Sequence, residues 1–366
     1  MKRLVVIVDS LRLDHYDYMP ATQDRFGESH DRAFAVATAT AGAFPQMMSG
    51  RYDAQHDVGD TDTWMHEIDD PTCFITTNRL VSERYGYDDG VTHFSSPISR
   101  GDESVKDRIA ERVPQGTVYE VLAKAWSFWQ KATSDTEKSF RTAESVIKEF
   151  RDWKQDKQDW CAVLHLMEPH HPYDPENIDH SRAEAQAISR DAIATETPSR
   201  PNDVRELYKH EVKEVDAQLE ELWDIIDDET QVIFTADHGE MLGEDGIWGH
   251  PGQTFHPSIL RIPWVTQNVE LKGDVVSFID IPAFLLRQDW REARLEREVA
   301  YASMGEMKCI FDKDWMVTED DTFRLSDGDK SRADELRSRL ERFDPSGISK
   351  QSGTREDLRA LGYLDG

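Results

Sequence analysis

The sequence LVVIVD at residues 4–9 indicates the architecture of this 366-residue chain. Its first five residues are apolar and four of them are β-branched, which is typical of a strand buried on both faces. Short apolar runs of the same kind lie at residues 73–77, 161–166, 232–235 and 259–265. Strands buried on both faces occur in parallel sheets that helices cover. These runs therefore predict the strands of a central, mostly parallel sheet.

The segments between these runs carry the periodicity of helices. We predict helices over residues 118–129, 134–153 and 204–226, and the last is the clearest because apolar residues recur along it near helical spacing. Strands and helices thus alternate along the chain, which favours an α/β fold whose central sheet is flanked by helices.

A polar segment interrupts this pattern at residues 174–203, where three prolines occur and apolar periodicity is weak. We interpret it as a surface excursion or lid, with a solvated helix over residues 183–192 as the alternative.

The pattern changes again after residue 263, where short strands follow one another. We predict a main α/β domain over residues 1–265 and a small C-terminal α+β subdomain over residues 266–366. The subdomain is expected to contain strands at 298–303, 308–311 and 315–318 and a charged helix at 330–343.

The composition narrows the class of protein. Lys and Arg number 43 against 72 Asp and Glu, so the formal net charge is −29. Such a field repels phosphate backbones and anionic lipids, which argues against a nucleic-acid partner and against a membrane surface. Concentrated salt screens the self-repulsion, so the charge suits a salt-rich cytoplasm. No apolar stretch approaches a membrane span, and we expect a soluble cytoplasmic protein without disulfides.

Acidic residues and a histidine follow two of the predicted strands directly. Asp9 comes after the first strand, and Asp237 and His238 come shortly after the strand at 232–235. Open α/β sheets bind ligands beyond the carboxyl ends of their strands. Carboxylate oxygen and imidazole nitrogen suit a divalent ion such as Zn²⁺ or Mn²⁺, whereas Mg²⁺ and Ca²⁺ favour more oxygen ligands. The alternative is structural: Asp9 caps a helix and Asp237 holds a turn.

Thr40 begins a second candidate feature, the sequence TAGAFPQMMSG at residues 40–50. This stretch predicts a short helix that ends at Gly50, with Thr40 near its positive N-terminal end. A metal-bound hydroxyl at that place can ionise and attack phosphorus or sulfur. The alternative is that Thr40 is an ordinary N-cap.

Histidines cluster in two loops. His170 lies in the sequence PHHP at residues 169–172, beyond the strand at 161–166, and prolines on both sides stiffen that loop. His250 belongs to a second group. Both are candidates for binding the oxygens of an ester or protonating its leaving group, and the alternative is a structural or solvated ring.

The order of these segments resembles the alkaline phosphatase superfamily and, within it, the sulfatase branch. That family opens with a strand that ends in an acidic metal ligand, here Asp9, and counting back from Gly50 places the family's nucleophile at Thr40. The matching segments are VIVDSLRLDH at 6–15, SGRY at 49–52, PHHP at 169–172, DHGE at 237–240, GH at 249–250, RIP at 261–263 and LRALGYL at 358–364. The resemblance implies a sulfatase-like catalytic domain over residues 1–265.

The sequence also departs from this family. Formylglycine sulfatases need a Cys or Ser in a Cys/Ser-x-Pro-x-Arg sequence, whereas Thr40 starts the corresponding stretch here, so no formylglycine is expected. Ser10 follows Asp9 where many sulfatases have a second Asp. The resemblance then implies one metal held by Asp9, Thr40, Asp237 and His238. A second metal remains open, with Asp216, His170, His250 or His256 as its candidate ligands.

The leading hypothesis is a metal-dependent hydrolase of phosphate or sulfate esters in which Thr40 is the nucleophile. The metal would be Zn, Mn, Ca or Mg, and the substrate a small anionic ester, with a sugar as one candidate for its alcohol. Arg12, Arg51 and Asn78 are the candidate substrate-binding residues. The alternatives are a phosphotransferase or mutase of the same superfamily and a catalytically silent relative that only binds an anion.

Overall fold

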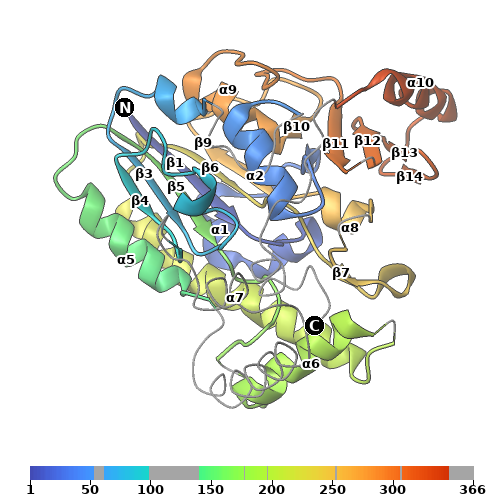
Figure 1. Cartoon of the computed structure of the whole chain (residues 1–366), viewed down its shortest axis with the longest axis horizontal. Helices are drawn as coiled ribbons and strands as arrows, with labels where there is room; N and C mark the ends of the chain where they lie inside the picture. The colour runs from blue at the N-terminus through green and yellow to red at the C-terminus, as the bar shows by residue number, and fades with distance from the viewer. Residues whose placement is uncertain are drawn as a thin grey trace, which may run out of the picture.

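A six-stranded sheet forms the centre of the computed structural model, in the order β4-β3-β5-β1-β6-β9 (Figure 1). Each pair of neighbours from β4 to β6 is parallel, and β9 is antiparallel to β6. The structure describes residues 1–52, 62–98, 140–176, 178–195, 197–251, 254–305 and 307–345. The prediction of an α/β fold with a mostly parallel sheet is confirmed.

The strands of the sheet correspond to most of the apolar runs in the sequence. They are β1 (Lys2–Val8), β3 (Thr72–Thr76), β4 (His93–Ser95), β5 (Trp160–Leu166), β6 (Gln231–Thr235) and β9 (Trp264–Gln267). All residues of β3, β5 and β6 are buried, as expected for strands covered on both faces. Strand β4 was not predicted because its three residues are half-buried at the edge and form no apolar run.

Helices cover both faces of the sheet. The helices are α1 (Pro20–Phe26), α2 (Thr40–Ser49), α5 (Ala143–Lys154), α6 (Arg182–Ala194), α7 (Pro201–Ile225), α8 (Pro257–Leu260) and α9 (Ile281–Leu286). Helix α5 packs on β3, β5 and α7, while α2 packs against α9. Figure 1 shows α2 and α9 on the opposite side of the sheet from α5 and α7. No helix in the described part of the chain is both long and apolar enough to span a bilayer.

The strand predicted at residues 259–265 is wrong in its first half. Helix α8 occupies Pro257–Leu260, and the strand, β9, begins only at Trp264. Pro257 stands at the first position of the helix, and the His256 side chain accepts a hydrogen bond from the backbone nitrogen of Ser258. These start signals favour a helical turn over the β-branched character of the run.

The helix predicted at 134–153 begins later than expected, at Ala143, because the Thr142 side chain accepts a hydrogen bond from the Ser145 amide and caps it. Residues 134–139 and the helix predicted at 118–129 lie outside the described residues. The polar segment at 174–203 contains helix α6, so the helical alternative is correct there.

The C-terminal part forms an antiparallel sheet of four strands followed by a helix. Its elements are β11 (Ala300–Met304), β12 (Met307–Phe311), β13 (Trp315–Thr318), β14 (Thr322–Arg324) and α10 (Lys330–Arg342). Ile310, Val317 and Leu336 are among the residues of a small apolar cluster between this sheet and α10. The exposed, polar strand β14 was not predicted.

Two short strand pairs complete the described fold. Strands β2 (Ala33–Phe34) and β10 (Val276–Ser277) pair in parallel, and β7 (Met241–Leu242) and β8 (Trp248–Gly249) pair antiparallel.

Candidate active site

Two buried carboxylates meet where the neighbouring strands β1 and β6 end. The pairing of Ile7 with Thr235 brings the residues that follow each strand to the same edge. The backbone amide of Asp9 donates to Leu166 of β5 at 2.8 Å, which anchors the first carboxylate. The Oδ1 atom of Asp237 accepts from the backbone amide of Ser10 at 3.3 Å. The sheet therefore places both carboxylates in one buried site.

Thr40 is the first residue of α2 and is fully buried beside these carboxylates. Its Oγ1 lies 2.8 Å from Asp237 Oδ2 and 3.1 Å from Asp9 Oδ2. Helix α2 ends as predicted at Gly50, whose φ of 62° is left-handed. The hydroxyl therefore stands at the N-terminal end of a helix, where the helix dipole favours negative charge.

His238 turns one ring nitrogen toward the same point. Its Nδ1 lies 2.9 Å from the Gly239 carbonyl oxygen, so Nδ1 carries the proton and Nε2 offers a lone pair. Nε2 lies 3.4 Å from Thr40 Oγ1. Gly239 must be a glycine here, because a Cβ would lie 2.2 Å from the Ser258 carbonyl oxygen.

The chemistry of this donor set fits a divalent cation. One ligand atom each from Asp9, Asp237 and His238 lie within 4.8 Å of one another, and all three residues are buried. Burial and the charge of Asp9 raise the pKa of Asp237 to about 8. Burial opposes ionisation of Asp9, but His170, His165 and His238 lower its pKa well below the usual range. A cation held among these groups would offset the charge of both carboxylates.

Asn78, a predicted substrate-binding residue, lies beside Asp9 and Thr40. Its Nδ2 donates to Asp9 Oδ2 at 3.1 Å and lies 3.5 Å from Thr40 Oγ1. His165, which no sequence pattern marked as a site residue, also lies here, with Nε2 3.3 Å from Asp9 Oδ2. Its Nδ1 lies 3.1 Å from Thr76 Oγ1. The signal was a polar residue near the carboxyl end of a buried apolar strand.

The predicted histidines His170 and His250 lie together beside this centre, with ring centroids 5.0 Å apart. The ring of His250 is 4.5 Å from that of His238. His170 Nδ1 lies 2.5 Å from the backbone oxygen of His171. Its Nε2 is buried, and none of the described residues forms a hydrogen bond with it.

Glu240 orients His250, a role that the sequence analysis did not assign. Its Oε1 lies 2.8 Å from His250 Nδ1, and its Oε2 accepts from the Tyr173 hydroxyl at 3.3 Å. Burial raises the pKa of Glu240 to about 7. Burial and the neighbouring imidazoles of His238 and His170 lower the pKa of His250, which favours its neutral form.

The guanidinium group of Arg12 binds carboxylates outside the cluster around Thr40. Asp14 accepts from its Nε at 2.8 Å and its Nη2 at 2.6 Å, and Glu244 accepts from Nη1 at 2.7 Å. Arg51 follows the C-terminal end of α2, roughly 15 Å along the helix from Thr40 at 1.5 Å per residue. The structure therefore does not bring either arginine into the cluster around Thr40.

Two of the residues considered for a second metal also lie apart from the cluster. The carboxylate of Asp216 accepts hydrogen bonds from the backbone amides of Ala21 and Thr22, at the start of α1. His256 caps α8.

The chain is similar to known proteins in sequence and in fold. The chain is 26% identical over 277 residues to the low-salt glycan biosynthesis sulfotransferase Agl7 of Haloferax volcanii. That match covers 71% of this chain and 52% of the relative, so the chain spans about half the length of the curated relative.

Two solved structures have a similar fold. A protein in complex with its substrate D-glucosamine-2-N,6-O-disulfate matches with a TM-score of 0.63 and 13% identity, over 100% of this chain and 98% of that chain. A phosphonate monoester hydrolase from Silicibacter pomeroyi matches with a TM-score of 0.56 and 14% identity, over 93% and 94%. The profile of the family described as Sulfatase matches residues 4–267, which include Asp9, Thr40, Asp237 and His238. The chain belongs to the Sulfatase family.

Proposed function

We propose that this protein is a metal-dependent enzyme that cleaves phosphate or sulfate esters with Thr40 as its nucleophile. The observation that supports it most directly is the position of Thr40 Oγ1, within 3.4 Å of Asp9, Asp237 and His238 at the N-terminal end of α2. A structural N-cap accepts a hydrogen bond from the backbone of its own helix. The N-cap of α2 is Ala39, and Thr40 Oγ1 is directed at the side chains of Asp9 and Asp237 instead.

Asp9, Asp237 and His238, with Thr40, would hold the metal. When bound, a divalent cation supplies positive charge that lowers the pKa of the Thr40 hydroxyl and offsets the charge of the ester oxygens. Asp237 Oδ2 accepts the hydroxyl proton at 2.8 Å. Thr40 Oγ1 then forms a bond to phosphorus or sulfur while the bond to the alcohol oxygen breaks.

His170 and His250 handle the remaining protons. His170 Nδ1 donates to the His171 backbone oxygen, so the proton for the departing alcohol oxygen comes from Nε2 of the imidazolium form, and Nε2 has no hydrogen-bond partner among the described residues. His250, which Glu240 orients through Nδ1, takes a proton from the water that attacks the threonine ester. This second half of the reaction breaks the bond to Thr40 Oγ1, which recovers its proton from Asp237. The proton that His250 took from water passes through solvent to His170, which restores both rings for the next turnover.

A transferase is the second candidate function, and one observation favours it: the relative from Haloferax volcanii is named a sulfotransferase. In that case an alcohol, instead of water, attacks the ester on Thr40 and receives the group. The name of the same relative, which refers to glycan biosynthesis, supports a sugar as one of the two alcohols.

The test is an assay of aryl phosphate, phosphodiester and aryl sulfate substrates in concentrated KCl with Zn²⁺, Mn²⁺, Mg²⁺ or Ca²⁺. Mass spectrometry of the quenched enzyme should find the transferred group on the peptide that contains Thr40. Thr40→Ala should abolish this adduct and turnover, while Thr40→Ser should retain a fraction of both.

Product analysis with and without an added sugar acceptor separates hydrolysis from transfer. Unchanged turnover by Thr40→Ala would remove Thr40 as the nucleophile. No turnover of any ester with any of the ions would favour the silent anion-binding alternative.

A further inference from the structure

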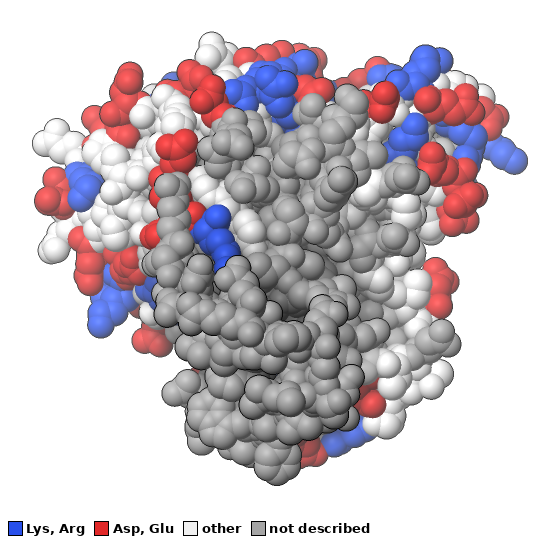
Figure 2. All heavy atoms as spheres, viewed as in Figure 1, with Lys and Arg blue, Asp and Glu red and all other residues white. Residues whose placement is uncertain are grey.

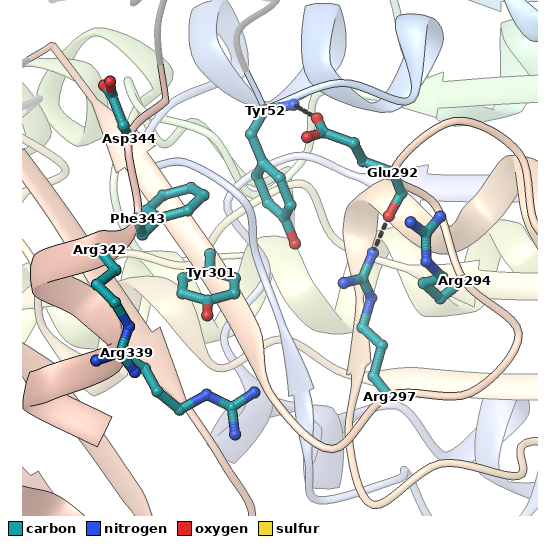
Figure 3. A pocket seen from close by; sticks show the side chains of 9 residues that line it. All are labelled: Tyr52, Glu292, Arg294, Arg297, Tyr301, Arg339, Arg342, Phe343 and Asp344. Atoms are coloured by element: carbon teal, nitrogen blue, oxygen red, sulfur yellow. Dashed lines mark hydrogen bonds between the residues drawn. The ribbon is translucent and has the colours of Figure 1, made fainter. Parts of the chain in front are cut away.

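A second polar pocket lies away from Thr40, between the segment that precedes β11 and the end of α10 (Figure 3). Its volume is about 390 Å³. Tyr52, which follows α2, lines it together with Tyr301 of β11 and Phe343 after α10. We call it the arginine pocket, because Arg294, Arg297, Arg339 and Arg342 also line it.

One wall of the arginine pocket is aromatic. The rings of Tyr301 and Phe343 stack with centroids 4.2 Å apart and an interplanar angle of 18°. The ring of Tyr52 meets Phe343 edge-on at 5.3 Å. Tyr301 and Phe343 are half-buried, so both keep part of their surface accessible. Stacking covers one face of each ring, and the accessible parts of both rings form an apolar surface that suits the apolar face of a sugar ring.

The arginines divide into structural and available groups. Arg297 is held by the buried carboxylate of Asp280, with Nε 2.6 Å from Oδ2. Arg339 has an exposed contact of 3.3 Å between Nη1 and Glu298 Oε2, which contributes little in water. Arg342 is exposed, and no ion pair or hydrogen bond joins its side chain to any residue that the structure describes. Arg339 and Arg342 therefore retain guanidinium donors for a ligand.

The charged residues that line the arginine pocket are mainly basic, whereas the chain as a whole is acidic. An adjoining hollow of about 280 Å³ adds Arg51 and Arg291. Among the described residues that line the two spaces, six arginines stand against two carboxylates, Glu292 and Asp344. The Glu292 carboxylate accepts from the backbone amide of Tyr52 at 2.6 Å. In Figure 2, basic side chains lie among acidic ones near the α10 end of the molecule, and the whole chain carries a net charge of −29.

Arg51 and Arg291 also affect each other. Burial and the positive charge of Arg51 lower the pKa of Arg291, while the charges of Asp62 and Glu67 raise it. An anion bound beside Arg291 and Arg51 would reduce the repulsion between these two arginines further. This surface therefore has the charge and shape of an anion-binding site.

We propose that the arginine pocket binds a sugar that carries a sulfate, phosphate or carboxylate group, at a site separate from the catalytic centre. The sugar ring packs against Tyr301 and Phe343, and Arg339 and Arg342 donate hydrogen bonds to the anionic group. The pocket begins where α2 ends, roughly 15 Å from Thr40 along the helix. The site does not depend on Thr40 being a nucleophile.

The test is calorimetric titration of the metal-loaded Thr40→Ala protein with glucose 6-sulfate, glucose 6-phosphate, glucuronate, glucose and inorganic sulfate. Thr40→Ala serves as the background so that the esters are not consumed. We expect the three anionic sugars to bind more tightly than glucose. Adding Arg342→Gln should weaken them about tenfold, the effect of losing one charge-assisted hydrogen bond. The comparison among the three identifies the preferred anion.

Arg324→Gln is the matched control, because Arg324 is an exposed arginine of the same subdomain that does not line the pocket. It should leave binding unchanged. Phe343→Leu should weaken the anionic sugars while leaving inorganic sulfate unaffected, because it removes part of the aromatic wall. Thermal melting checks that each variant is folded.

The proposal is overturned if Arg342→Gln and Phe343→Leu bind the sugars as the background protein does, since binding would then lie at the catalytic centre or be absent. It is also overturned if Arg324→Gln weakens binding as much as Arg342→Gln, because the effect would then be general charge. Active Thr40→Ala protein would contradict the proposed nucleophile but leave this measurement intact.

Discussion

The two ends of α2 lie in opposite electrostatic surroundings. At its N-terminal end, Thr40 contacts two fully buried carboxylates. Beyond its C-terminal end, Arg51 and Tyr52 border spaces lined by six arginines. The buried carboxylates lack the water that would screen them, so they require a cation or a proton. Arg339 and Arg342, in contrast, retain hydrogen-bond donors for a ligand, and Arg342 is exposed to solvent. Helix α2 therefore separates a site whose buried carboxylates are stabilised by a cation from a site whose arginines can bind an anion.

The largest expected effect is the loss of turnover when Asp237, one of the two carboxylates at the N-terminal end of α2, is replaced. Asp237→Asn should lower turnover by at least about 10⁴-fold, which corresponds to more than about 5 kcal/mol, because it removes a metal ligand and the acceptor of the Thr40 proton. Steady-state kinetics with saturating metal measures this. Arg342→Gln should leave kcat on a small aryl ester unchanged. Comparable losses of kcat in both variants would contradict the separation of the two ends.

The second prediction concerns the buried ion pair between Arg297, which lines the arginine pocket, and Asp280. Arg297→Gln should lower the free energy of unfolding by about 3–4 kcal/mol, because it leaves the carboxylate of Asp280 buried without its charged partner. Chemical denaturation measures the change. Arg324→Gln should change stability by less than about 0.5 kcal/mol, since its ion pair is exposed. If the two variants were equally stable, the buried pair would not support the pocket wall.

The third prediction tests the charge of the buried centre without metal. The pKa of Asp237 is raised to about 8, so the folded state holds a proton that the unfolded state releases near pH 4. The stability of the chelated protein should therefore fall by about 1–2 kcal/mol as the pH rises from about 6.5 to 8, above the range in which the lowered pKa of His250 acts in the opposite direction. The pKa of Asp9 is lowered, so its titration changes the stability only below this pH range.

Thermal melts of chelated protein across this pH range provide the measurement. The raised pKa of Glu240 contributes in the same direction, so Asp237→Asn should reduce the slope without removing it. Metal loading of the wild type should also flatten it. A slope that is identical in wild type and Asp237→Asn would show that Asp237 is not the group that titrates.

The smallest predicted effect lies at the end of α2. Gly50→Ala should destabilise the protein by about 1–2 kcal/mol, because Gly50 has a φ of +62° and a Cβ would lie 2.6 Å from the Trp290 ring. Denaturation measures the change, and kcat on an aryl ester should stay near the wild-type value. A large loss of kcat would mean that the two ends of α2 are more closely linked than their distance indicates.

The sequence predicts the residues around Thr40 better than it predicts the elements and the pocket outside that cluster. Asp9, Asp237 and His238 were identifiable because each follows a buried strand, and strand order then determines their meeting. Thr40 was identifiable from a helix that ends at Gly50. His165 was missed because it is the second-last residue of an apolar strand, which is a weaker signal than a polar residue that follows the strand.

Some elements and sites depend on tertiary contacts that local patterns do not contain. The run at 259–265 has strand-forming residues, but Pro257 starts a helix within it. The arginine pocket combines Tyr52 with residues after 290 and after 338, which no local pattern links. Arg51 was expected to bind substrate at Thr40 but lies instead beside this pocket.

Every residue of α2 is buried, including Phe44, Met47 and Met48. The segment that bears Thr40 is therefore also part of the hydrophobic core, where changes of volume are costly. Mutational tolerance should be low along this helix. Divergence toward new esters should accumulate in the loops that follow the strands, while the helix that presents the hydroxyl remains constant.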